Sequence, residues 1–75
     1  MKLLSTTLAE GTRVSGKYCG DFSFTGVISH VRFAPRNSYY YEVKLDSPIC
    51  VYGGQLRNSI SFYSGDSWAK EIVVV

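Results

Sequence analysis

The residues best suited to covalent chemistry in this 75-residue chain are one histidine, His30, and two cysteines, Cys19 and Cys50. A cysteine or serine nucleophile needs a base within hydrogen-bonding reach. Ser29 adjoins His30, but neighbouring side chains on a strand point to opposite faces. Both cysteines are distant from the histidine in sequence. The pattern does not favour nucleophilic catalysis, and we expect a protein that is not an enzyme.

Metal and phosphate sites also lack their sequence patterns. A structural zinc site needs four Cys or His ligands, whereas the chain has two cysteines and one histidine. Gly53-Gly54 and Gly16-Lys17 fit neither the GxxxxGK[ST] nor the GxGxxG pattern of phosphate-binding loops. We therefore expect neither a metal nor a cofactor.

The chemistry that remains is recognition, and the stretch 24–46 concentrates it. Alternating apolar residues predict strands over 24–33 and 39–46, joined by the connector Ala34-Pro35-Arg36-Asn37-Ser38. If Phe33 pairs with Tyr39, one face of this hairpin is nearly all apolar and the other is mixed. The predicted inner pairs are Val31/Tyr41, Ser29/Val43 and Val27/Leu45, and the predicted outer pairs are Arg32/Tyr40, His30/Glu42, Ile28/Lys44 and Gly26/Asp46.

The outer face of this hairpin is the best candidate for a working surface. Arg32 over Tyr40 can form a cation–π contact worth about 0.5–1 kcal/mol when exposed. Glu42 beside His30 favours the charged imidazole, and Arg36 lies at the tip of the connector. Alternation sends Tyr39 and Tyr41 inward. The candidate contact residues are therefore Tyr40, Arg32, His30 and Arg36.

Two interpretations of these residues stay open. They can be ordinary cross-strand pairs on the wet side of a sheet. Alternatively they contact a partner, because Tyr and Arg are enriched among residues that anchor interfaces and also suit bases and phosphates. Trp68 has a similar ambiguity, since it can cover one end of the fold or present a ring beside Tyr63. The secondary candidates are Trp68, Tyr63, Arg57, Arg13 and Lys17.

The rest of the chain predicts further short strands separated by turns. Gly53-Gly54 suits a two-residue turn with positive φ, and Pro48 is expected to break its strand because it cannot donate to a ladder. Helix signals are short, at 5–10 and 66–70. The expected strands are 11–18, 49–52, 56–63 and 71–75, with turns at 19–21 and 64–67.

Five or six short strands with little helix predict an all-β fold, a small antiparallel barrel. The order of the predicted strands and turns resembles that of SH3-like barrels, in the broad sense that includes KOW and Tudor modules. Residues 10–14, 25–28 and 41–46 match the first three strands of that pattern, and 66–70 match its tight turn. The resemblance covers most of the chain. It departs at 47–57, which is longer than the usual link and adds a hairpin.

Composition bounds the remaining possibilities. A chain of this length makes one domain, 1–75, in which 1–9 is flexible or a short helical turn. No stretch has the length of a signal-peptide core or a membrane span. We expect a soluble cytoplasmic protein that does not bind membranes, with two free thiols buried on strands. The alternative is a disulfide between Cys19 and Cys50, which requires Cα atoms within about 7 Å.

These observations favour a non-catalytic binding module for a macromolecular partner. The net charge of +2 favours a protein over a nucleic acid, because strong electrostatic binders carry a larger clustered excess. Nucleic-acid binding would need Arg13, Lys17, Arg32, Arg36 and Arg57 on one side.

An alternative is an oligomeric binder of an anionic nucleotide, with its site between subunits joined through edge strands. A compact, tyrosine-rich β domain is also typical of many phage or mobile-element proteins that block a host factor by binding it.

Overall fold

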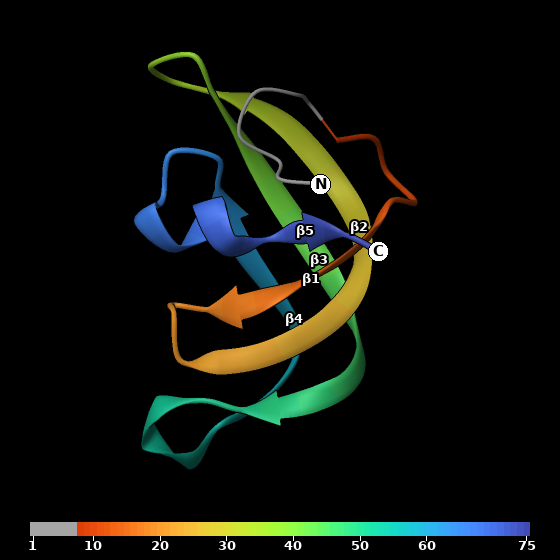
Figure 1. The fold of residues 1–75 in the computed structure, drawn as a ribbon, viewed down its shortest axis with the longest axis vertical. Helices are drawn as coiled ribbons and strands as arrows, with labels where there is room; N and C mark the ends of the chain where they lie inside the picture. Colours follow the sequence, from red (N-terminus) through yellow and green to blue (C-terminus); the bar gives the residue numbers. More distant parts are fainter. Residues whose placement is uncertain (1–7) are drawn as a thin grey trace.

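The computed structural model describes residues 8–75, so most of the segment predicted as flexible or helical, 1–9, lies outside the described residues. The described chain is all-β, as predicted. Five antiparallel strands form one sheet in the order β4-β3-β2-β1-β5 (Figure 1). The elements are β1 Arg13–Tyr18, β2 Phe22–Ala34, β3 Ser38–Cys50, the 3-10 turn η1 Tyr52–Gly54, β4 Leu56–Tyr63, the 3-10 turn η2 Ser67–Glu71 and β5 Val73–Val74.

The long central hairpin is confirmed and extends further than predicted. β2 and β3 each contain 13 residues. The connecting turn is shorter than the five-residue connector, because Ala34 already pairs with Ser38. Arg36 and Asn37 close this turn with positive φ values of 63° and 57°. Asn adopts this left-handed backbone readily, whereas Arg does so at a cost.

The predicted register of the hairpin holds only near its tip. Phe33/Tyr39, Arg32/Tyr40, Val31/Tyr41 and His30/Glu42 pair as expected. A β-bulge at Ser29 then inserts one unpaired residue in β2, which shifts every later pair by one. The predicted pairs Ser29/Val43, Val27/Leu45, Ile28/Lys44 and Gly26/Asp46 are wrong, and the observed ones are Ile28/Val43, Val27/Lys44 and Gly26/Leu45.

The bulge also exchanges the faces of the residues around it. Ile28, expected outside, is 1% exposed and belongs to the core. Ser29, expected inside, is exposed and donates its hydroxyl to the carbonyl of Glu42 at 3.3 Å. Val27 shares the outer face with Lys44 and is half-buried. The core therefore takes Ile28 in place of Val27.

β3 leaves β2 beyond Leu45, and a glycine marks the point of departure. A Cβ on Gly26 would lie 2.4 Å from the Lys44 carbonyl oxygen, closer than real Cβ atoms approach. Beyond this crossing β3 pairs only with β4, and that pairing lapses between Lys44 and Ile49. Pro48 falls within the lapse, so it needs no ladder hydrogen bond. The prediction that Pro48 ends the strand is therefore wrong, since β3 runs to Cys50.

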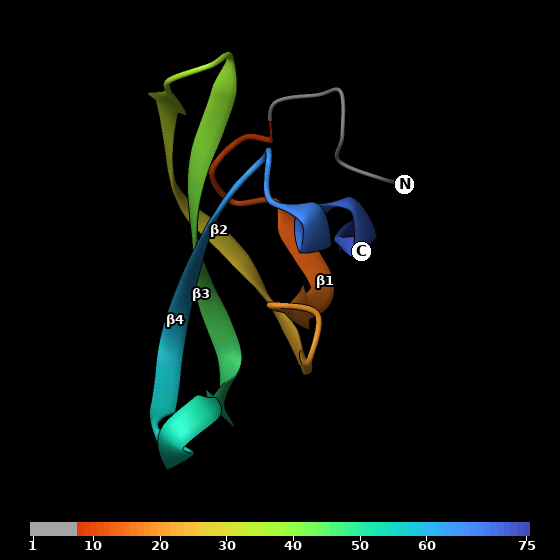
Figure 2. The same ribbon diagram turned by 90° about the vertical axis from the view of Figure 1, so that its left-hand side faces the viewer.

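The core lies between two parts of the folded-over sheet. Figure 2 shows β3 and β4 on one side and β1 with η2 on the other. Gly16 permits this closure, because a Cβ there would lie 2.9 Å from Cγ1 of Ile72. The buried cluster is Leu8, Val14, Phe24, Ile28, Tyr41, Val43, Leu45, Ile60, Phe62, Ala69 and Ile72.

Several smaller predictions can be compared directly. The return strand is confirmed at Leu56–Tyr63, and Gly53 and Gly54 have the expected positive φ. The last strand is shorter than 71–75, because η2 takes Glu71. Cys19 and Cys50 are free thiols as expected, but both are exposed rather than buried. None of the helices among residues 8–75 is long and apolar enough to cross a membrane.

Candidate functional site

A row of three side chains crosses the outer face of β2, β3 and β4. Arg32 on β2 pairs with Tyr40 on β3, and Tyr40 pairs in turn with Tyr63 on β4. The guanidinium carbon of Arg32 lies 5.1 Å from the centroid of the Tyr40 ring. The Tyr40 and Tyr63 rings are 5.3 Å apart and tilted by 57°. We call these residues the Arg-Tyr-Tyr row. It confirms the predicted cation–π pair and brings the secondary candidate Tyr63 beside it.

Glu42, two residues further along β3, fixes the orientation of Tyr40. Its hydroxyl donates to the Glu42 carboxylate at 3.0 Å, so the ring is held at both ends. His30 pairs with Glu42 across the strands as predicted. Nδ1 of His30, however, lies 3.9 Å from a carboxylate oxygen of Glu10. Glu10 comes from the segment before β1, a long-range neighbour that hairpin pairing cannot identify.

The tip of the hairpin carries an exposed aromatic ring and adjoins a groove beside the row. Phe33 is 69% exposed, and its ring packs edge-on against Tyr39 at 5.6 Å. A shallow groove of about 390 Å³ runs between this tip and the row. Phe33 lies on the face opposite the row, as alternation predicts. It was expected to be buried there, but it is exposed because the core ends before the hairpin does. The groove is lined by Arg32, Phe33, Ala34, Pro35, Tyr40 and Tyr63.

The remaining cations do not gather around the row. Arg13 forms an ion pair with Asp46, at 2.6 Å, and that carboxylate raises the pKa of the guanidinium by hydrogen bonding and by its charge. Arg36 lies in the turn at the hairpin tip, and Lys17 pairs with Ser23 near the β1–β2 turn. In Figure 1 the β2–β3 turn lies at the top of the molecule and the β1–β2 turn lies lower, on the left. Arg13, Lys17 and Arg36 thus do not form one cluster.

Arg57 lies on the same outer face as the row, at the start of β4. It lines a polar groove together with Tyr40, Glu42 and two serines of β4, Ser59 and Ser61. These serines are exposed and were not recognised from the sequence. Their alternation with the buried Ile60 and Phe62 is the pattern that marks them as facing outward.

Trp68 packs against the core from η2. Its ring lies 5.4 Å from Phe62 and 5.4 Å from Tyr18, and the side chain is half-buried. Tyr63 lies on the opposite face of β4 from Phe62, so Trp68 is not beside Tyr63. The geometry agrees with the interpretation of Trp68 as a cover over one end of the core.

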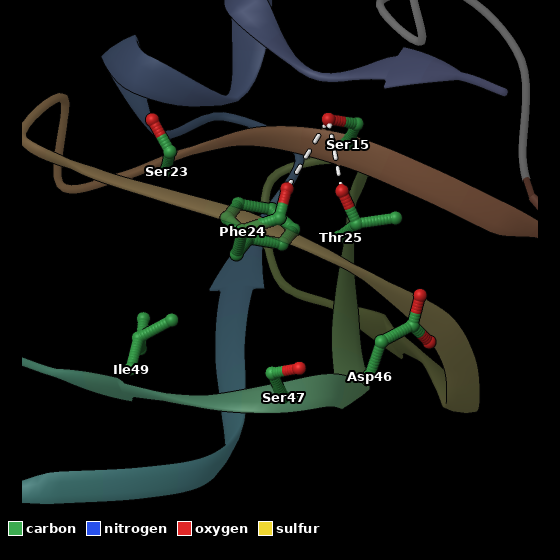
Figure 3. A pocket seen from close by; sticks show the side chains of 7 residues that line it. All are labelled: Ser15, Ser23, Phe24, Thr25, Asp46, Ser47 and Ile49. Carbon is green, nitrogen blue, oxygen red and sulfur yellow. Dashed lines mark hydrogen bonds between the residues drawn. The ribbon is translucent and has the colours of Figure 1, made fainter.

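A second cavity opens where β3 departs from β2, and Figure 3 shows its walls. Its volume is about 290 Å³. Ser15 donates to the Phe24 carbonyl at 3.2 Å and accepts from the Thr25 hydroxyl at 3.4 Å. Asp46 on the facing wall is bound to Arg13. Ser15 and Thr25 are therefore paired with each other, and Asp46 is paired with Arg13, which does not line the cavity.

Comparison of the chain with protein-family models, with curated proteins and with solved structures gave no match. The likeness to SH3-like barrels therefore stays a prediction. Within residues 8–75, no three His, Cys, Asp or Glu side chains lie together as ligands for a metal would.

Proposed function

We propose that this chain is a non-catalytic binding module that contacts a protein partner through the Arg-Tyr-Tyr row and the adjoining hairpin tip. The observation that carries the proposal is the arrangement of Arg32, Tyr40 and Tyr63 as one continuous row along a groove that the hairpin tip also lines. Tyr, Trp and Arg dominate the residues that anchor protein interfaces. An aromatic ring already held on both sides also loses little side-chain entropy on binding.

The distribution of charge supports a protein rather than a nucleic acid. Phosphate-backbone binding depends on several cations placed along one surface. Here Arg13 is neutralised by Asp46, Lys17 lies near the β1–β2 turn, and Arg36 lies in the β2–β3 turn. Glu42 also places a carboxylate next to the row. Such a mixed surface suits a partner that offers both apolar and charged groups.

Affinity capture with and without nuclease tests the proposal. The immobilised chain is exposed to cell lysate, and the bound material is identified at low and at high salt. We expect a discrete protein that is retained after nuclease treatment and whose binding changes little with salt. Recovery of nucleic acid alone, with an affinity that falls steeply with salt, would replace the protein partner by a nucleic acid.

A further inference from the structure

The two edges of the sheet differ in how well they are protected. β5 offers only two residues, Val73 and Val74, whereas β4 offers eight. Natural edge strands are usually guarded by lysines, prolines, inward charges or short length. The sequence of β4, Leu56-Arg57-Asn58-Ser59-Ile60-Ser61-Phe62-Tyr63, contains one charge and no proline. Within residues 8–75, no strand pairs with its outer side.

The hydrogen bonds of β4 identify which of its backbone groups face this open side. Ser64 donates its N–H to the Tyr39 carbonyl at 2.9 Å, which makes Tyr39 and Ser64 a hydrogen-bonded pair of the β3–β4 ladder. Because such pairs alternate along antiparallel strands, Phe62 and Ile60 also bond towards β3. The N–H and C=O groups of Tyr63, Ser61 and Ser59 consequently point away from it.

The outward N–H and C=O groups of one of these three residues, Tyr63, are already hydrogen-bonded. The Tyr63 N–H donates to the Asp66 carboxylate, and the Tyr63 carbonyl accepts from the Asp66 N–H, both at 2.9 Å. This turn closes the C-terminal end of the edge. Ser59 and Ser61 keep two N–H and two C=O groups for which the described residues supply no backbone partner. The open edge is thus the short stretch 59–61, centred on Ile60.

We propose that a second copy of this chain pairs with β4 in antiparallel orientation, with the two-fold axis at Ile60. In this register Ser59 lies opposite Ser61 of the partner subunit, and Ser61 lies opposite the partner's Ser59. Each serine exchanges both of its backbone hydrogen bonds with its opposite residue. The open backbone groups of Ser59 and Ser61 are therefore complementary to those of a second copy, as an isologous interface requires.

The side chains of the outer face support the same register. The two-fold axis at Ile60 sets Arg57 opposite Tyr63 of the partner subunit, and Tyr63 opposite the partner's Arg57. Each pair brings a guanidinium to an exposed ring, a favourable cross-strand combination. No two like charges face each other, because Arg57 is the one charged residue of β4. The dimer would extend each Arg-Tyr-Tyr row by one cation.

The proposal does not rest on the proposed function, since dimerisation is measured on the purified chain without any partner. Sedimentation equilibrium under reducing conditions, which keep the exposed thiols Cys19 and Cys50 from cross-linking, gives the mass. We expect a value that rises towards twice the chain mass of 8.4 kDa with concentration. A mass that stays at 8.4 kDa up to about 1 mM, where even a millimolar dimer is populated, overturns the proposal.

Variants at Ser61 locate the interface. Ser61→Pro removes an N–H that β3 does not use, so the monomer should fold while the dimer is lost. Ser61→Ala keeps the N–H and should dimerise as the wild type does. A dimer that persists in Ser61→Pro uses another surface. A monomeric wild type whose capture of a partner is weakened by Ser61→Pro would assign the edge to a strand of that partner instead.

Amide hydrogen exchange of the wild type gives a test that needs no variant. The amides of Ser59 and Ser61 should be protected at high chain concentration and should exchange freely after dilution. Protection that does not change with dilution, or free exchange at a concentration where the mass is that of a dimer, contradicts pairing through β4.

Discussion

Gly26 should tolerate no side chain, and the structure allows the cost of adding one to be worked out. A Cβ at this position would lie 2.4 Å from the Lys44 carbonyl oxygen, 2.8 Å from Cγ1 of Val43 and 3.1 Å from Cα of Leu45. Two of these three atoms belong to the backbone of β3, so rotation of a side chain cannot relieve the contact. Gly26→Ala must therefore push β3 away from β2 at the crossing.

The expected loss follows from two opposing effects. Overpacking of a well-packed interior costs about 1–3 kcal/mol, and the rigid backbone contact places this case at the upper end. Replacing glycine also restricts the unfolded chain, which returns about 0.4–1 kcal/mol. The net loss is about 2 kcal/mol, a large part of the roughly 4–11 kcal/mol available to a domain of this size. The melting temperature should fall by about 8–16 °C.

Urea and thermal unfolding of matched variants measure this effect. Gly65→Ala is the control, because a Cβ on Gly65 meets no atom within 4 Å and the residue lacks a positive φ. We expect Gly65→Ala to match the wild type or to be slightly more stable. If the two variants differ by less than about 0.5 kcal/mol, the close approach of β3 to Gly26 is not a real constraint and the reasoning is refuted.

Three further predictions concern the turn, the ion pair and the tryptophan. Arg36→Gly should raise the free energy of unfolding in urea by about 0.5–1 kcal/mol, because it removes the strain of a left-handed arginine but gives the unfolded chain more freedom. Asn37→Gly should raise the free energy of unfolding by less. An equal gain would contradict the assignment of strain to Arg36. A double-mutant cycle of Arg13→Ala and Asp46→Ala should give a coupling that shrinks in about 1 M salt, because both side chains are close to half exposed; a salt-independent coupling would contradict screening by solvent. Trp68→Ala should cost about 2 kcal/mol, below the roughly 3–5 kcal/mol of a fully buried ring, and an unchanged melting temperature would show that Trp68 does not cover the core.

The tip of the central hairpin was predictable because local signals agree there. The turn residues place Phe33 opposite Tyr39, and strict alternation then assigns Arg32 and Tyr40 to one face. The predicted pairs are correct as far as His30/Glu42. The cation–π contact followed from this register alone.

The bulge at Ser29 was not predictable from alternation. Val27 and Ile28 are adjacent apolar residues, so either one satisfies the inner face and the pattern does not distinguish a bulge from a regular strand. Gly26 is buried against β3, where the strands approach so closely that no side chain fits. Residues two apart on a strand share a face, so Ile28 is buried with Gly26 and Val27 is not. That close approach depends on tertiary packing rather than on local sequence.

Long-range neighbours were beyond the reach of the sequence for the same reason. The position of Tyr63 beside Tyr40 requires the β3–β4 register, which changes between Lys44 and Ile49. The contact of His30 with Glu10 joins segments that no hairpin connects. The composition of the candidate site was therefore predicted in part, and its geometry came from the fold.

Whether the Arg-Tyr-Tyr row is the contact surface can be tested by measuring the affinity of a captured protein for the wild type and for a variant with a disrupted row. Arg32→Ala combined with Tyr40→Ala removes the cation–π pair, and Tyr52→Ala is the matched control, since Tyr52 is 66% exposed and η1 lies at the opposite end of the molecule in Figure 1. We expect the double variant to stay folded and to bind at least about 30-fold more weakly in Kd, the size of an interface hot spot, while Tyr52→Ala binds as the wild type does. Wild-type affinity in the folded double variant would contradict the claim that the Arg-Tyr-Tyr row is the contact surface.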